Sequence, residues 1–355
     1  MEFIKPDTHV DFLGKRKYAF SASLFMILLT VVLLLWRGGP NYGVDFSGGI
    51  LIQVKMPEKK TPAEIRDALR GIQLQDSIIQ EFGESKEHEF LIRVNNPDIH
   101  LEGLSDKVEK VLSSQFGKGV EIRRVEMVGP KVGADLRQKA LFAIFYAILL
   151  IAIYISGRFE FSWLKSIIMA FCLAFVVYTA SSFGLRVTWL IIVAVLATLA
   201  LCWVLKLKYA LGAIVALIHD LTITVGAFAL TNREISLPII AALLTILGYS
   251  LNDTIVVFDR IRENVRRFRR RSFQEVMNAS INETLSRTIL TSSTTLLVVV
   301  ALFVLGGGVI HDFAFALMVG IIVGTYSSIF VASPILLIWE GGFLGNPKQP
   351  KGGAK

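Results

Sequence analysis

The fold class of this chain is decided first by residues 18–36, which read YAFSASLFMILLTVVLLLW. The run contains no charged residue and is close to the roughly 20 residues that a helix needs to cross a bilayer. Lys15, Arg16 and Lys17 precede it, and Arg37-Gly38-Gly39-Pro40 follows it. It is longer than a typical cleavable signal segment, and no small-x-small cleavage pattern follows. We therefore predict an uncleaved signal anchor.

Similar apolar runs recur along the chain, in which 53% of the residues are hydrophobic and 19% are charged. The chain of 355 residues is too long and too apolar to form a single buried core. The bilayer-thickness criterion places later spans at 139–156, 164–183, 188–205, 209–230, 237–257, 288–306 and 313–338. We predict a polytopic α-helical membrane protein. The pair joined by Gly184-Leu185-Arg186-Val187 could instead be a tight hairpin that does not cross fully.

The formal net charge of +8 could suggest a nucleic-acid partner, but its distribution favours membrane topology. Acids and bases nearly cancel over 37–138, while the excess of basic residues lies beside the apolar runs. With a cytoplasmic N-terminus, the cytoplasmic side receives Lys15–Lys17, Arg158, Lys165, Lys206, Lys208 and the arginine cluster Arg260–Arg271. We predict a multi-pass protein with both termini cytoplasmic, in contact with the lipid bilayer and with no nucleic acid. Contact of the cluster with anionic lipid or RNA is the alternative.

The polar segment 37–135 predicts a small α/β domain. Ile50, Ile52 and Val54 alternate with more polar residues, as in a half-buried strand. Thr61 and Glu64 form a capping-box pattern that opens a helix. Further strands are expected at 77–82, 88–94 and 120–128, with a helix at 104–116. The order β-α-β-β-α-β predicts a ferredoxin-like, extracytoplasmic domain, a fold that by itself decides no function.

Asp253 is the first candidate for chemistry, because it lies inside the predicted span 237–257. An uncompensated carboxylate there costs roughly 2.5–3.5 kcal/mol or more, so it should face protein or water and have a partner. Arg287 opens the next span and is the candidate counter-charge. The hydroxyl run Thr291–Thr295 follows, and part of it should line a helix contact or a wet path. The bland alternatives are a carboxylate that locks helices together and an arginine that snorkels at the membrane border.

Three further sites carry polar residues near or inside predicted spans. His219 and Asp220 lie near the middle of 209–230, where they form either a proton relay or a satisfied buried contact. Asn252 and Asp259 share one face of the next span, and for Asp259 a structural role is favoured. Cys172 and Cys202 both fall within predicted spans and indicate neither a disulfide nor a metal site. No hydrolase, P-loop or metal pattern occurs, so we expect no enzyme activity, no metal and no cofactor.

Several motifs resemble the SecD/SecF family of protein-export membrane proteins. GVDFSGG at 43–49, after the first span, resembles the opening of the family's outer domain, and VGPKVG at 128–133 resembles its entry to the second span. ALIHD at 216–220, GYSLNDTIVVFDR at 248–260 and SRTILT at 286–291 resemble the SecF branch in particular. The matches cover nearly the whole chain in the family's order.

The resemblance implies a subunit that pairs with SecD beside the SecYEG channel, within the resistance–nodulation–division superfamily. Such complexes use the proton-motive force to assist translocation of unfolded secretory polypeptides across the bacterial inner membrane. The family's proton-path carboxylate and arginine would fall on Asp253 and Arg287. Two other readings remain open: a proton-coupled small-molecule or lipid exporter, and a non-conducting scaffold of the translocon.

One departure from the family pattern is expected. SecF-type chains have six spans, whereas here two extra apolar runs separate Arg158-Phe159-Glu160 from Tyr209. The resulting division is 1–36 (N-terminus and first span), 37–135 (outer domain), 136–160 (second span), 161–208 (inserted hairpin), 209–340 (membrane core with a basic cytoplasmic loop at 260–286) and 341–355 (cytoplasmic tail). An inserted pair of spans keeps the sidedness of everything that follows it.

Overall fold

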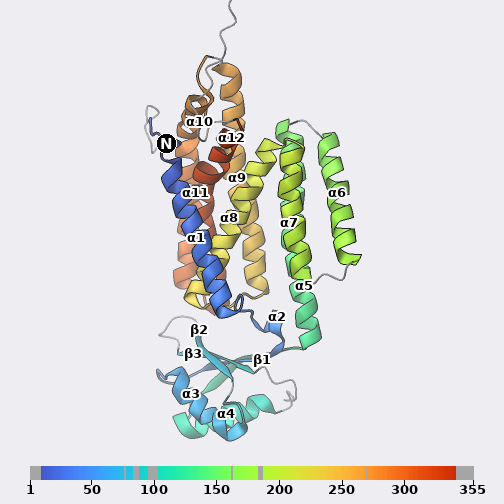
Figure 1. The fold of residues 1–355 in the computed structure, drawn as a ribbon. Coiled ribbons are helices and arrows are strands. Elements are labelled where there is room, and N and C mark those ends of the chain that lie inside the picture. The colour runs from blue at the N-terminus through green and yellow to red at the C-terminus, as the bar shows by residue number, and fades with distance from the viewer. Residues whose placement is uncertain are drawn as a thin grey trace, which may run out of the picture.

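The computed structural model describes residues 9–75, 77–82, 88–94, 103–160, 163–182, 187–268 and 270–340. A bundle of long helices carries a small α/β domain at one end (Figure 1). The chain enters this sheet domain after α1 (Arg16–Arg37) and α2 (Val44–Ser47), and it returns to the bundle through α5 (Pro130–Glu160). The predicted separation of an apolar helical part from a polar α/β part is therefore confirmed.

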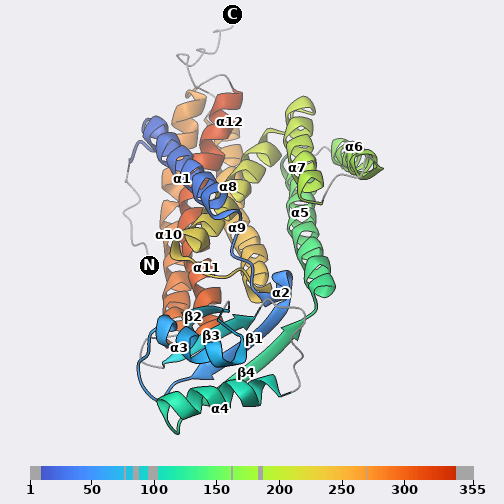
Figure 2. The same ribbon diagram turned by 60° about the horizontal axis from the view of Figure 1, so that its bottom comes forward.

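The sheet domain contains β1 (Gly49–Lys55), α3 (Pro62–Leu69), β2 (Ile78–Phe82), β3 (Glu89–Val94), α4 (Leu104–Phe116) and β4 (Glu121–Val128). Its strands pair antiparallel in the order β2-β3-β1-β4, which agrees with the predicted split-βαβ arrangement. The inward residues Ile50, Ile52 and Val54 are buried against the two helices. Thr61 and Glu64 form both bonds of the predicted capping box. Figure 2 shows α3 and α4 on the face of the sheet that lies away from the bundle.

The glycine motif at 43–49 contains the one-turn helix α2. Gly48 has φ 73°, in the left-handed region that glycine adopts without strain. A Cβ on Gly48 would lie 2.8 Å from the Cα of Pro130, and one on Gly133 would lie 2.9 Å from the nitrogen of Gly48. The two family-like glycine motifs thus pack backbone against backbone where the chain enters and leaves the sheet domain.

Among the described residues, 7 helices are long and apolar enough to cross a membrane. They are α1, α5, α6 (Trp163–Ser182), α8 (Lys208–Thr231), α9 (Leu237–Arg267), α10 (Phe273–Leu305) and the composite helix formed by α11 (Gly308–Ser327), the π-helical turn η2 (Ser328–Ala332) and α12 (Ser333–Trp339). The apolar part of α7 (Val187–Val204) is shorter, at Trp189–Val204. A helix therefore lies at every position where a span was predicted, and the chain is a multi-pass membrane protein.

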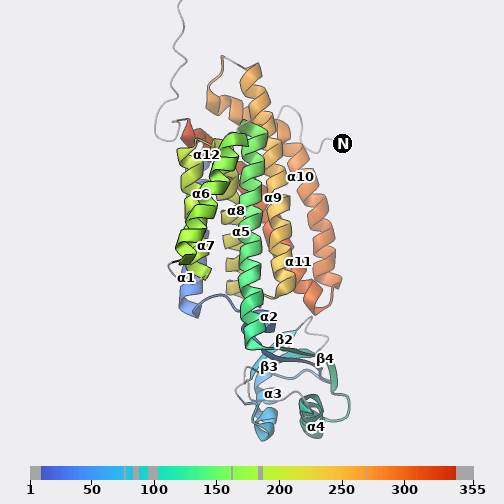
Figure 3. The same ribbon diagram turned by 90° about the vertical axis from the view of Figure 1, so that its right-hand side faces the viewer.

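The connection predicted as a basic loop at 260–286 is mostly helical. α9 continues to Arg267, and α10 already begins at Phe273, behind a capping box formed by Ser272 and Glu275. Asn264 donates hydrogen bonds to Ser280 and Glu283 across the two helices. The bilayer-thickness criterion locates only the apolar part of a helix, so it misses polar extensions stabilised by caps and side-chain bonds. Figure 3 shows this helical hairpin extending past the bundle at the end opposite the sheet domain.

The hairpin of α6 and α7 lies at the edge of the bundle beside α5 (Figures 1 and 2). Ser166 donates a hydrogen bond of 2.9 Å to Ser156 of α5. The ring of Trp163 packs directly on Gly157, because a Cβ added to Gly157 would lie only 2.7 Å from a carbon of that ring. Next to the hairpin, the backbone nitrogen of Tyr209 donates to Glu160 over 3.1 Å. The end of α5 and the start of α8 therefore meet.

Candidate functional site

Asp253 lies on α9 with only 3% of its surface exposed. The hydroxyl of Ser292, on α10, donates to Asp253 Oδ2 over 3.3 Å. The hydroxyl of Thr325, on α11, donates in turn to Ser292 over 2.7 Å. A carboxylate thus sits among three apolar helices, attached to a short chain of hydroxyl groups.

The side chains of the hydroxyl run on α10 point to different faces of the helix and therefore have different hydrogen-bond partners. Thr291, Thr294 and Thr295 each donate to a carbonyl one turn back in their own helix. Ser292 is buried and bonds across the helix contact instead. The prediction that part of this run lines a helix contact is confirmed. One turn before Ser292, the buried Thr288 hydroxyl has no hydrogen-bond partner among the described residues.

Arg287, the predicted counter-charge, is exposed on α10. Both it and Asp253 are described, and no ion pair within 4.0 Å joins them. Asn252, next to Asp253 on α9, is also exposed. Two exposed polar side chains, Asn252 of α9 and Arg287 of α10, therefore accompany the buried carboxylate on the two helices that the Ser292 bond joins. The role of Arg287 as counter-charge stays a prediction.

His219 and Asp220 form a second polar centre, which is fully enclosed. Asp220 is 0% exposed and His219 is 3% exposed. His219 Nδ1 lies 2.9 Å from Asp220 Oδ1, and its Nε2 lies 3.1 Å from the hydroxyl of Ser23 on α1. Ser250 of α9 and Ser327 of α11 donate to Asp220 Oδ2 over 2.6 and 2.8 Å. This network ties α8 to α1, α9 and α11, an arrangement that suits helix locking.

The two buried carboxylates therefore differ in how strongly they are held. Asp220 accepts from three side chains, whereas the described part of the chain supplies Asp253 with one bond, from Ser292. A carboxylate with few fixed partners changes its protonation state at a smaller structural cost. Asp253 is thus the better candidate for a group that loads and releases a proton.

Asp259 lies near the end of the bundle opposite the sheet domain. It accepts a hydrogen bond of 2.7 Å from Arg158 of α5, and both side chains are more than two-fifths exposed. An ion pair so open to solvent contributes little stability, and no hydrogen bond among the described residues joins it to the buried hydroxyl chain. This position agrees with the structural role favoured for Asp259.

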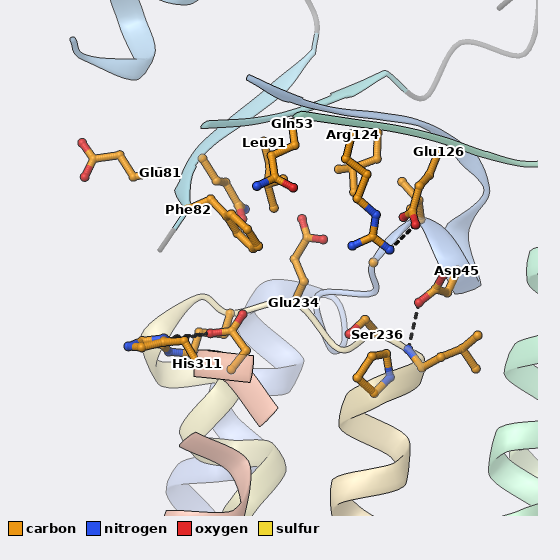
Figure 4. Close-up of a pocket in the computed structure, with 18 of the residues that line it drawn as sticks. Asp45, Gln53, Glu81, Phe82, Leu91, Arg124, Glu126, Glu234, Ser236 and His311 are labelled. Carbon is orange, nitrogen blue, oxygen red and sulfur yellow. Dashed lines mark hydrogen bonds and ion pairs between the residues drawn. The ribbon is translucent and has the colours of Figure 1, made fainter. Parts of the chain in front are cut away.

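A cavity of about 650 Å³, which the sequence did not predict, lies between part of the sheet and the end of the bundle. Its lining comes from the sheet face opposite α3 and α4, from the α8–α9 connection and from the start of α11 (Figure 4). Arg233 pairs with Asp312 and bonds to His311 at its base. Glu234 pairs with Arg93 over 3.2 Å. Burial raises the pKa of Glu234, and Arg93 opposes this with a smaller effect.

Comparison with known proteins agrees with this architecture and with the motif order. Residues 107–202 and 186–342 match the family described as protein export membrane protein SecD/SecF, C-terminal, and residues 34–56 match the SecD/SecF GG motif. The chain belongs to the SecD/SecF family. The GG-motif match covers Gly48, which packs against Pro130, so that contact joins two family segments.

Curated relatives that match along nearly the whole chain are named protein translocase subunit SecF. The family member from Magnetococcus marinus is 41% identical over 349 residues, covering 96% of each chain. That from Vibrio alginolyticus is 39% identical over 336 residues, covering 95% of this chain and 91% of the relative. The crystal structure of SecDF, a translocon-associated membrane protein from Thermus thermophilus, superposes with a TM-score of 0.72 at 31% identity. The match covers 96% of this chain but 40% of the SecDF chain.

Proposed function

We propose that this chain is the SecF-type subunit of an inner-membrane SecDF complex that uses the proton-motive force to assist Sec-dependent protein translocation. Its partners are then SecD, the SecYEG channel and an unfolded secretory polypeptide. The match to curated SecF proteins along nearly the whole chain supports the assignment to this complex. Both termini are cytoplasmic in this proposal, and the sheet domain is extracytoplasmic.

The observation that carries the proton-coupled part is the position of Asp253. It is buried between α9, α10 and α11, and a single hydroxyl of the described residues holds it. Burial disfavours the charged form, while a hydrogen bond and a nearby cation favour it. In this proposal Asp253 gains and loses a proton during each cycle. Arg287 and Asn252, exposed beside it, face a SecD span that completes the path.

The test uses the complex of this chain with SecD, purified together and reconstituted into proteoliposomes with SecYEG. Proton flux and export of a secretory protein are measured for the parent chain and for Asp253→Asn. The amide keeps the shape of the carboxylate but cannot take part in proton transfer. We expect both flux and late export to be lost. Normal export with unchanged flux would refute the proposal, and failure to co-purify with SecD would remove its basis.

A further inference from the structure

The connection between α8 and α9 holds the sheet domain through its backbone. Gly43 donates from its nitrogen to the carbonyl of Ile235 over 2.9 Å, and Ile235 donates back to Asn41 over 2.7 Å. Tyr42 and Ile235 thereby form a parallel β-bridge. A short loop between two membrane helices is thus paired with the segment that leads into β1.

A largely buried ion pair reinforces this bridge from the sheet. Arg93, on β3, approaches Glu234 of the loop to 3.2 Å, and the two side chains are only 7% and 16% exposed. The same guanidinium nitrogen donates to the carbonyl of Tyr42 over 2.6 Å. Arg93 therefore fastens β3, the bridge segment and the loop at one point. Three charged groups act on Glu234: the guanidinium of Arg93 attracts its negative charge, and the carboxylates of Asp312 and Asp45 repel it.

A third contact fixes the first turn of α9. The carboxylate of Asp45, on α2, accepts a hydrogen bond of 2.8 Å from the backbone nitrogen of Leu237 (Figure 4). From Leu237, α9 continues without a break past Asp253. At 1.5 Å per residue the two positions are roughly 24 Å apart along one helix. A shift of α9 at Asp253 therefore reaches the contacts made by Asp45 and Glu234.

The sheet also has room to move next to these contacts. The cavity of about 650 Å³ lies beside the loop, with Gln53 and Leu91 of the sheet facing Pro238 and His311 of the bundle. Figure 4 shows Glu234 rising from the loop into the space below the strands. One side of the interface is thus fastened by an ion pair and a β-bridge, and the neighbouring space is open. This geometry suits pivoting of the sheet about the fastened side.

We infer that Arg93 and Glu234 are coupling residues, which pass movement of α9 to the sheet domain. In this role they touch neither the proton nor the translocating chain, and they act by positioning β3 relative to α9. The inference rests on the proposed function, since it concerns how proton movement at Asp253 reaches the extracytoplasmic side. It predicts a specific defect: proton flux that no longer drives export.

The test reverses each charge in the SecD-containing proteoliposomes. We expect Arg93→Glu and Glu234→Arg to keep proton flux within about twofold of the parent while export falls roughly tenfold or more, because like charges then meet in a largely buried site. The double reversal, Arg93→Glu with Glu234→Arg, should restore part of the export, because it re-forms the ion pair but not the hydrogen bond to the Tyr42 carbonyl. The matched control reverses the exposed ion pair of Asp135 and Lys139 on α5, and it should change neither readout.

Two outcomes would overturn the inference: normal export in the single reversals, or proton flux and export that decline in proportion. If a reversal variant fails to fold, Arg93→Lys and Glu234→Gln take its place, since both keep a hydrogen-bonding group. They should give a partial loss of export at unchanged flux, and full export in both would equally overturn the inference. Failure of the proposed function looks different, because Asp253→Asn would then leave flux and export intact.

Discussion

Ser292 donates a hydrogen bond to Asp253 across the contact between α10 and α9, and Thr325 donates to Ser292 from α11. Three helices therefore share one short line of polar groups inside an otherwise apolar region. A hydrogen bond to a charged group inside a protein contributes more stability than one between neutral groups. A change of charge at Asp253 therefore acts first on the hydrogen bonds made by Ser292 and Thr325.

Substitution of both Asp253 and Arg287 distinguishes a proton-driven protein from a non-conducting scaffold. We expect the double variant Asp253→Asn with Arg287→Gln to fold, since the two side chains make no direct ion pair, but to lose proton flux and export. Size-exclusion profiles and the flux assay check this together. Asp259→Asn is the control and should retain both activities, because Asp259 pairs with Arg158 away from the hydroxyl line. Full activity in the double variant would favour the scaffold.

Removing the Ser292 hydroxyl should destabilise the protein. Ser292→Ala removes the bond to Asp253 and the acceptor that Thr325 uses across the helix contact, and we expect a loss of roughly 1–3 kcal/mol in the free energy of unfolding. Denaturant unfolding in detergent measures this change. Thr294→Val is the matched control, because Thr294 is exposed and bonds only within its own helix. Equal stability of the two variants would contradict a role for the interhelical bond.

Asp220 should matter more for folding than Asp253 does. Asp220→Ala leaves His219, Ser250 and Ser327 without their shared acceptor, and breaking such a buried centre costs roughly 3–5 kcal/mol. Thermal unfolding should therefore show a much larger decrease for Asp220→Ala than for Asp253→Asn. The reverse order would show that the His219 network does not lock the bundle.

The stability of the sheet domain should depend on pH through Glu234. Its raised pKa means that the folded protein keeps a proton that the unfolded chain has already released. Between the ordinary glutamate pKa of about 4.3 and the raised value, stability therefore falls as pH rises. Glu234→Gln should remove this slope in thermal unfolding. If the melting temperature changes with pH in the same way in the parent and in Glu234→Gln, Glu234 is not the group responsible for the slope.

Glu64 provides the control of opposite sign. Hydrogen bonds from the backbone and side chain of Thr61 lower the pKa of Glu64. Its stabilising contribution is present above the ordinary glutamate pKa and is lost as pH falls through the lowered value. Glu64→Gln should therefore reduce the loss of stability that occurs as pH falls. Glu234→Gln should reduce the loss of stability that occurs as pH rises.

The features predicted from sequence are those with a local signal. An apolar run long enough to cross a bilayer marks a span, and the pattern of Thr61 and Glu64 marks the start of α3. Asp253 and His219 were noticeable because ionisable groups interrupt apolar runs. The polar continuation of α9 to Arg267 carries no such mark, because nothing in a charged stretch distinguishes a capped helix from a loop.

Which residues contact one another across the fold had no such local signal in the sequence. Thr325 meets Ser292, and Arg93 meets Glu234, only because the helices and the sheet pack as they do. The two members of each pair lie far apart in the chain, and hydroxyl and charged side chains occur at many positions. The charges at 233 and 234, in a short connection between apolar runs, were the one available hint of the cavity.

The contact between Tyr209 and Glu160 bears on the history of the chain. It brings the last residue of α5 and the second residue of α8 together, so the α6–α7 hairpin starts and finishes at one place on the bundle. A segment with such neighbouring ends can be acquired or discarded in a single genetic event without displacing any other helix. The same membrane core therefore accommodates the chain with or without this hairpin, and the exposed aromatic side chains of the hairpin are free to change independently of the core.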